Sequence, residues 1–249
     1  MSQQNRLAIA KKAAYLAGSE IIRIYENSFE HIVEMKEDNS PLTIADKTSN
    51  DVIIRMLRDE FPDISILSEE NTSDTTRFNN DWCWIIDPLD GTKEFLKKSG
   101  EFTVNIALSY KGRAIIGVIY LPVLEVLYYA AEGIGAYKEE KGQAQKICVS
   151  DKTDELILVG SKSHSTSRLK SLISEKEDLI AETISAGSSL KGVMVAEGAA
   201  DVYYRFGNTC EWDTAAMQCI VEQAGGVFRQ LDGSEMTYNR RNSLNEKVY

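Results

Sequence analysis

Residues 82–95 read WCWIIDPLDGTKEF, and this stretch decides how the chain is organised. Its apolar beginning predicts the end of a buried strand, and Pro88 favours an extended backbone at Asp87. Asp87 and Asp90 can then point at one spot beyond the strand. Gly91 lets the backbone approach a ligand, and the amides after it open like a helix N-terminus. Carboxylates that face free amides suit hard cations bridged to a phosphate, although the same residues are also typical of an ordinary turn.

Composition limits the class of protein. The chain has 249 residues, of which 43% are apolar and 27% charged, as expected of a globular protein. Its net charge of −10 argues against nucleic acid polymers and anionic membranes as partners. The four cysteines lack C-x-x-C spacing, so we expect a reduced, cytoplasmic protein. We expect no signal peptide and no integral membrane segment, because no suitable apolar run is present.

Hydrophobic periodicity predicts an α+β protein. We expect helices at residues 3–27, 43–60, 166–176 and 211–224, and a short helix that ends at 197. We expect strands at 31–36, 65–68, 156–160 and 201–206, a strand that ends at 86, an antiparallel meander over 102–137 and a last strand that begins at Val227. Helices and strands are segregated, which predicts layers in two interlocked halves, 1–146 and 147–249, that form one compact catalytic unit.

Four acidic residues stand where predicted elements end. They are Glu69, Asp87, Asp90 and Asp213. Each has a simpler interpretation, since Glu69 can be a solvated loop residue and Asp213 can cap the helix it precedes. None of the four lies on a charged helical face, which favours a shared site. The spacing of Thr43 and Asp46 is that of a capping box, and for this pair the structural interpretation is favoured.

Several motifs taken together carry a family resemblance. The sequence DPLDGT at 87–92 follows EE at 69–70 and precedes WDTAA at 212–216 and AGG at 224–226. This combination resembles the inositol monophosphatase superfamily of Mg²⁺-dependent, lithium-sensitive phosphomonoesterases, over nearly the whole chain from residue 36. The resemblance implies a layered αβαβα sandwich of the sugar-phosphatase type.

A closer resemblance is to the bacterial 3′(2′),5′-bisphosphate nucleotidases within that superfamily. KEF at 93–95, GSKSH at 160–164, SSLK at 188–191 and RFG at 205–207 fit this branch. Lys162 departs from it, because the branch usually has arginine there. Lysine keeps the charge but loses the bidentate fork of a guanidinium group.

The resemblance also implies a metal centre with two or three Mg²⁺ ions. Glu69, Asp87 and the carbonyl group of Leu89 would hold one ion. Asp87, Asp90 and Asp213 would hold another, so that Asp87 bridges the two. Two such ions can neutralise a phosphoryl group, activate water and stabilise the leaving oxygen, as hydrolysis of a phosphomonoester requires.

The remaining site residues are likewise implied by the resemblance. Glu69 and Thr92 would orient the nucleophilic water, and Asp46 with Thr43 would support this pair or hold a third ion. Substrate contacts would come from Gly91, Thr92, His164, Ser188, Lys191, Arg205 and Asp213. In this assignment the amides of Gly91 and Thr92 receive phosphate oxygens, and Lys191 and Arg205 hold a second phosphate. The simpler alternatives are ordinary surface charges for Lys191 and Arg205 and a structural role for His164.

The implied activity is removal of the 3′-phosphate of adenosine 3′,5′-bisphosphate, giving AMP and phosphate. The sulfated analogue 3′-phosphoadenylyl sulfate is a further expected substrate. The partner is thus a small nucleotide, and the protein is expected to be a monomer or a homodimer. The alternatives are inositol monophosphatase or fructose-1,6-bisphosphatase activity, and a non-catalytic metal-binding relative. Lys191 and Arg205 disfavour inositol monophosphate, which has no second phosphate, and the intact acids and Thr92 disfavour a non-catalytic protein.

Overall fold

The computed structural model describes residues 2–27, 33–35, 41–161 and 167–245. Its helices are α1 (Gln3–Glu26), α2 (Ile44–Glu60), α3 (Thr92–Leu96), α4 (Ser167–Glu175), α5 (Leu190–Ala196) and α6 (Glu211–Gln223), with a 3₁₀ helix η1 (Thr76–Asn79). Its strands are β1 (Val33–Met35), β2 (Pro41–Thr43), β3 (Ser65–Ser68), β4 (Trp82–Asp90), β5 (Thr103–Tyr110), β6 (Arg113–Leu121), β7 (Val126–Ala131), β8 (Gly135–Glu140), β9 (Gln143–Lys146), β10 (Leu156–Ser161), β11 (Ile180–Ala186), β12 (Val202–Tyr203), β13 (Thr209–Cys210) and β14 (Leu244–Asn245).

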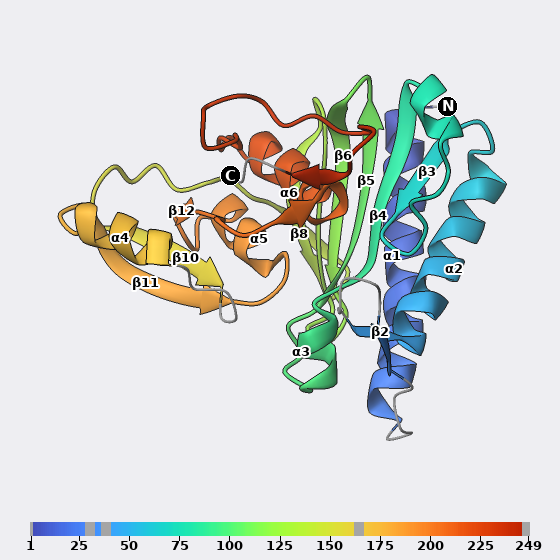
Figure 1. Ribbon diagram of the computed structural model, residues 1–249, viewed down its shortest axis with the longest axis horizontal. Helices are drawn as coiled ribbons and strands as arrows, with labels where there is room; N and C mark the ends of the chain where they lie inside the picture. The colour runs from blue at the N-terminus through green and yellow to red at the C-terminus, as the bar shows by residue number, and fades with distance from the viewer. Residues whose placement is uncertain (1, 28–32, 36–40, 162–166, 246–249) are drawn as a thin grey trace.

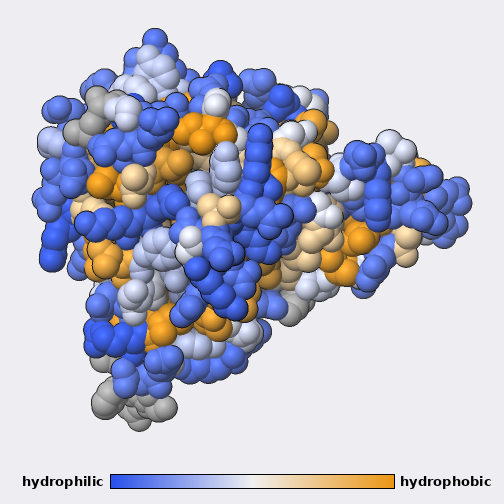
Figure 2. All heavy atoms as spheres, turned by 180° about the vertical axis from the view of Figure 1, so that it is seen from behind, coloured by the Kyte–Doolittle hydropathy of each residue, from blue (hydrophilic) through white to orange (hydrophobic). Residues whose placement is uncertain are grey.

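The elements form five layers, as the sequence predicts. Helices α1 and α2 lie on one side of a seven-stranded sheet, and α6 and α5 lie on the other (Figure 1). The smaller sheet β11-β10-β12 lies beyond α5 and carries α4 (Figure 1). This outer part projects from the body, and seen from behind its surface is largely hydrophilic (Figure 2). The arrangement is the layered αβαβα sandwich expected from the resemblance.

The seven-stranded sheet runs in the order β3-β4-β5-β6-β7-β8-β9. Strands β3 and β4 are parallel, and each later neighbour pairs antiparallel, which confirms the predicted meander. Because side chains alternate along a strand, β4 serves two cores. Trp84 and Ile86 face the core beneath α1 and α2, whereas Cys83 and Ile85 face α6. Any polar side chain in phase with Ile85 therefore points toward α6.

Helices approach this sheet closely because small residues line the contacts. Ala10, Ala14 and Ala17 of α1 are fully buried. A Cβ atom at Gly18 would lie 2.4 Å from the ring of Tyr120, so only glycine allows the observed approach. None of the helices formed by the described residues combines the length and hydropathy that a bilayer crossing requires.

Three strand predictions need correction. No strand begins at Val227: the chain leaves α6 through Gly225, whose φ is +95°, and Phe228 is apolar because it enters the core. The strand expected at 201–206 is only β12, an edge strand that pairs with β10 at Leu158 and Val159. The strand expected to end at 86 continues to Asp90.

The division into residues 1–146 and 147–249 stays a prediction. Strand β9 ends at Lys146, and α6 from the second part packs on the sheet formed by the first. Of the strand expected at 31–36, residues 33–35 are described and form β1.

The close contact between β6 and α6 generates the first prediction. A Cβ atom at Gly117 would lie 2.4 Å from the carbonyl oxygen of Ala216, which is backbone and cannot rotate away. We expect Gly117→Ala to lower the free energy of unfolding by about 1–3 kcal/mol, as overpacked cores do. Urea denaturation measures the loss. Gly160→Ala is the matched control, because its nearest contacts lie at an ordinary 3.7 Å. Equal losses in the two variants would contradict the proposed close approach.

Candidate metal centre

Parallel pairing of β3 with β4 brings the first two acids together. Ser68 is in register with Ile86, and the amide of Glu69 donates to the carbonyl of Ile86 at 3.1 Å. Both strands thus deliver their next residue at the same edge of the sheet. The side chains of Glu69 and Asp87 form a hydrogen bond there. This contact joins two acids that are eighteen positions apart in the sequence.

A β-bulge in β4 aligns Asp87 with Asp90. Asp87 is opposite Asn105 and Asp90 is opposite Thr103, so β4 has one more residue than β5 in this interval. In a regular strand, residues at i and i+3 point to opposite faces, and the extra residue restores them to the same face. Pro88 fits the bulge because it has no amide hydrogen to pair. Both carboxylates therefore point toward α6.

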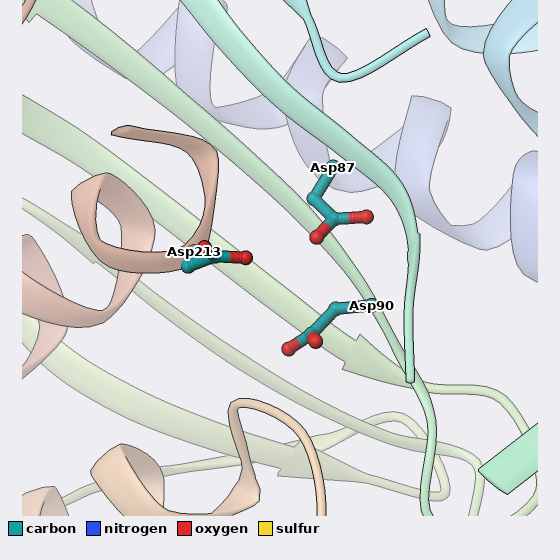
Figure 3. Close-up of side chains that lie close together, drawn as sticks. All are labelled: Asp87, Asp90 and Asp213. Carbon is teal, nitrogen blue, oxygen red and sulfur yellow. The ribbon is translucent and has the colours of Figure 1, made fainter. Parts of the chain in front are cut away.

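Asp213 arrives from the first turn of α6. Its carboxylate accepts the amide of Cys210, the N-cap residue, at 2.6 Å, so Asp213 is the third helical residue of a capping box. The oxygens that Asp87, Asp90 and Asp213 offer lie within 4.8 Å of one another. In Figure 3 the three carboxylates point toward one another, two from the strand and one from the helix.

Electrostatics in this cluster favour a cation. Burial, followed by the charges of Glu69, Asp90 and Asp213, raises the pKa of Asp87 well above its ordinary value. Burial, followed by the charge of Asp90, raises the pKa of Asp213 from 3.8 to about 7. Like charges in low dielectric repel, and a divalent cation would remove this penalty. The all-oxygen donor set therefore fits a hard ion such as Mg²⁺.

Asp46 caps a helix and also contacts Thr92, while its predicted catalytic role stays a prediction. The amide and hydroxyl of Thr43 donate to Asp46 Oδ2 at 2.7 and 2.6 Å, which confirms the capping box. The hydroxyl of Thr92 donates to Asp46 Oδ1 at 3.2 Å and lies 3.5 Å from the carbonyl of Leu89. The cap of α2 thus also orients the hydroxyl that begins α3.

Gly91 makes the turn between β4 and α3 possible. It has φ of +96°, a conformation that glycine adopts without strain. A Cβ atom there would lie 3.2 Å from the carbonyl oxygen of Glu101. The position therefore requires glycine for both its conformation and its close backbone neighbour.

Two cations lie beside the acids. Lys191 is only 4% exposed, and its ammonium group donates to the carbonyl of Ser188. Burial lowers the pKa of Lys191 to about 8, although Asp90 opposes the shift. Arg205 lies close enough to lower the pKa of both Lys191 and Asp213. Its Nε atom is buried and makes no hydrogen bond within the described residues. His164, the other expected nucleotide contact, and Lys162 lie outside the described residues.

The sequence did not predict that Thr103, Asn105 and Ser189 hold Asp90. Asp90 Oδ2 accepts the hydroxyls of Ser188 and Ser189 at 2.6 and 2.7 Å. The amide of Asn105 lies 3.4 Å from the same oxygen, and the hydroxyl of Thr103 lies 3.5 Å from it. Ser188, expected as a phosphate donor, is thus placed on a carboxylate, and its substrate role stays a prediction. The available signal was a pair of polar residues, 103 and 105, on one face of an apolar strand.

Comparisons with known proteins show the family of this chain. A sequence model of the inositol monophosphatase family matches residues 2–247. The chain belongs to the inositol monophosphatase family. It is 43% identical over 230 residues to the 3′(2′),5′-bisphosphate nucleotidase CysQ of Salmonella typhimurium, with 92% of each chain covered.

Two solved structures are similar to the whole chain. The crystal structure of CysQ from Bacteroides thetaiotaomicron, a bacterial member of this family, has a TM-score of 0.85 and 41% identity, covering 99% of this chain and 96% of that one. An IMPase of Thermotoga maritima has a TM-score of 0.81 and 26% identity, covering 96% of this chain and 90% of that one.

The raised pKa values predict how stability depends on pH without metal. Between its ordinary pKa of 3.8 and about 7, Asp213 binds more proton in the folded than in the unfolded state. The free energy of unfolding therefore falls as pH rises through this window. We expect wild-type protein in chelator to be less stable at about pH 8 than at about pH 5, and Mg²⁺ to restore most stability at the higher pH. Denaturant titrations at both pH values measure this.

The control for this prediction is Asp213→Asn, which has no group to titrate at that position. Its stability should depend less on pH than that of the wild type. An equal pH dependence in both proteins would show that titration of Asp213 is not its cause.

Proposed function

We propose that this chain is a Mg²⁺-dependent phosphatase that removes the 3′-phosphate of adenosine 3′,5′-bisphosphate to give AMP and phosphate. One observation carries the proposal: the cluster of Asp87, Asp90 and Asp213 lies beside the cations Lys191 and Arg205. A substrate with two phosphates needs both the acids, which would bind metal ions at one phosphate, and the cations, which would bind the other. The similarity to proteins named 3′(2′),5′-bisphosphate nucleotidase supports the same activity.

The acids would hold the metal ions. Glu69, Asp87 and the carbonyl of Leu89 would hold one Mg²⁺, and Asp87, Asp90 and Asp213 would hold another. Bound Mg²⁺ would supply positive charge that neutralises the phosphoryl oxygens and makes water more acidic. The protein contributes carboxylates that are each already held by a hydrogen-bond donor or a neighbouring acid.

The nucleophilic water would be oriented by Thr92 and Glu69, with Asp46 in support of Thr92. The Thr92 proton is engaged on Asp46, so the Thr92 oxygen can accept a hydrogen bond from that water. The Glu69 carboxylate can accept the second proton and orient the lone pair of the water toward phosphorus. The amides of Gly91 and Thr92 would receive phosphate oxygens.

Lys191 and Arg205 would hold the 5′-phosphate. Lys191 is buried, and its desolvated ammonium group gains most from an anionic ligand. The Nε atom of Arg205, which makes no hydrogen bond to the described residues, is a donor suited to a phosphate oxygen. The analogue 3′-phosphoadenylyl sulfate carries a negative group at the same end and should be accepted. His164 and Ser188 would complete the nucleotide contacts.

The proposal includes a small nucleotide as partner and a cytoplasmic location. All four cysteines are free thiols, as a reducing compartment favours. We propose that residues 1–146 and 147–249 act as one catalytic unit, because Asp213 of the second part completes the site begun by the first. The assembly would be a monomer or a homodimer.

The metal role of Asp90 generates a prediction. Asp90→Asn is nearly isosteric but removes the charge, so we expect kcat at saturating Mg²⁺ to fall at least about 100-fold. The fold should survive, as judged by circular dichroism. Asp81→Asn is the control, because Asp81 is exposed and makes only a loose pair with Lys111. If the Asp90 variant keeps more than about a tenth of the wild-type kcat, then Asp90 is not an essential metal ligand.

Substrate discrimination tests the second phosphate site. A hydrogen bond to a charged group contributes roughly 1.5–3 kcal/mol, or about 10- to 150-fold in affinity. We therefore expect Lys191→Ala or Arg205→Ala to lower kcat/KM for adenosine 3′,5′-bisphosphate by that factor. Hydrolysis of 3′-AMP, which has no 5′-phosphate, should change little. Lys170→Ala, which removes an exposed lysine of α4, is the control. Equal losses on both substrates would instead indicate a role in the fold or the metal centre.

A further inference from the structure

The side-chain hydrogen bonds that the described residues make to the carboxylate of Asp90 all go to one of its two oxygens, Oδ2. Two serine hydroxyls donate to Oδ2 at 2.6 and 2.7 Å, and the side chains of Asn105 and Thr103 approach the same atom at 3.4 and 3.5 Å. A carboxylate oxygen has about two lone-pair positions, so the serines alone occupy Oδ2. Among the contacts of the described residues, Oδ1 of Asp90 is then the oxygen left free to bind an ion.

Neighbouring side chains fix the orientation of one of these donors, Ser189. The Asn105 amide donates to the Ser189 hydroxyl at 2.9 Å, so the proton of Ser189 must point at Asp90. The Asn105 carbonyl oxygen accepts the Thr103 hydroxyl at 2.9 Å. The Ser188 hydroxyl lies 2.7 Å from that of Thr103 and 3.1 Å from the Asp90 carbonyl oxygen, and Asp90 Oδ2, at 2.6 Å, is the closest acceptor for its single proton. Ser189, Asn105 and Thr103 are nearly inaccessible to water, which cannot easily replace these bonds.

This arrangement bears on which ion the site prefers. Mg²⁺ is small, requires near-octahedral geometry and takes one oxygen from each carboxylate. Ca²⁺ accepts roughly six to eight oxygens and readily uses both oxygens of one carboxylate. A carboxylate with one oxygen already occupied can therefore still bind Mg²⁺ normally, whereas its affinity for Ca²⁺ is lowered.

We propose that Ser188 and Ser189 restrict Asp90 to one-oxygen coordination and thereby set the preference of this centre for Mg²⁺ over Ca²⁺. The inference rests on the proposed function, which supplies the metal role of Asp90. Asp90 is the ligand on which the proposal can be tested, because the donors to its Oδ2 atom are side chains that substitution can remove. Asp87 and Asp213 are held by the backbone amides of Leu89 and Cys210, which substitution does not remove.

Two variants free Oδ2 by different routes. Ser189→Ala removes one donor and leaves the backbone unchanged. Ser188→Gly removes the other, and glycine tolerates the φ of +46° found there. The second variant also covers the case in which the buried Ser189→Ala change prevents folding. Ser109→Ala is the matched control, because Ser109 is a buried serine of β5 whose hydroxyl has no partner among the described residues.

The test measures metal affinity directly, without substrate. Isothermal titration calorimetry with MgCl₂ and with CaCl₂ gives the two dissociation constants of each protein. We expect the preference for Mg²⁺ over Ca²⁺ to fall about tenfold or more in each variant, mainly through tighter Ca²⁺ binding, as loss of one charge-assisted hydrogen bond predicts. Ser109→Ala should keep the wild-type ratio. Inhibition of phosphate release by Ca²⁺ should follow the same order.

The outcomes separate this inference from the proposed function. An unchanged ratio in both folded variants, with Mg²⁺ binding and Mg²⁺-dependent hydrolysis intact in the wild type, overturns the inference alone. Loss of affinity for both ions to the same extent also overturns it, because the serines would then only support the fold. Wild-type protein that binds Mg²⁺ but does not hydrolyse adenosine 3′,5′-bisphosphate contradicts the proposed function and leaves the coordination result standing.

Discussion

Repulsion among buried carboxylates is the constraint on which the rest of this structure depends. Asp87 is almost inaccessible to water, and burial together with three neighbouring acids raises its pKa. Such a cluster is unfavourable in a folded protein unless protons or a cation neutralise it. The chain maintains it with hydrogen-bond donors to Asp87, Asp90 and Asp213, which come from Leu89, Ser188 and Cys210 respectively. The same feature that costs stability creates a strong electrostatic attraction for Mg²⁺.

The layered fold makes this cluster possible, because several elements end at the same place. The parallel pair β3 and β4 brings Glu69 to Asp87, and the bulge in β4 turns Asp90 to the same face. Helix α6 packs on that face with its first turn above the bulge, and its capping box presents Asp213. Small residues such as Gly117 permit the close approach of α6 to the sheet. The close packing of α6 on the sheet is therefore also what places Asp213 beside Asp87 and Asp90.

The second part of the chain joins the site through short polar contacts. Ser188 links both aspects of the centre, since its hydroxyl donates to Asp90 and its carbonyl accepts Lys191. Lys191, which is proposed to hold a phosphate of the substrate, is therefore connected through Ser188 to Asp90, which is proposed to bind metal. This proximity fits a substrate whose two phosphates lie a few bonds apart on one ribose, and it connects metal coordination with substrate selection.

The sequence by itself determined the element types, the meander, the capping box at Thr43 and the set of acids, because periodicity and short motifs are local properties of the chain. Family resemblance extended this to the layered sandwich, and the roles that it implies for distant residues stay predictions. Only the tertiary structure decided that Thr103, Asn105 and Ser189 hold Asp90, because each contact joins residues far apart in the sequence. The absence of a strand at Val227 was also a tertiary outcome, since Phe228 is apolar to fill the core and not to pair in a sheet. Hydrophobicity signals burial, but which partner buries a residue depends on the whole fold.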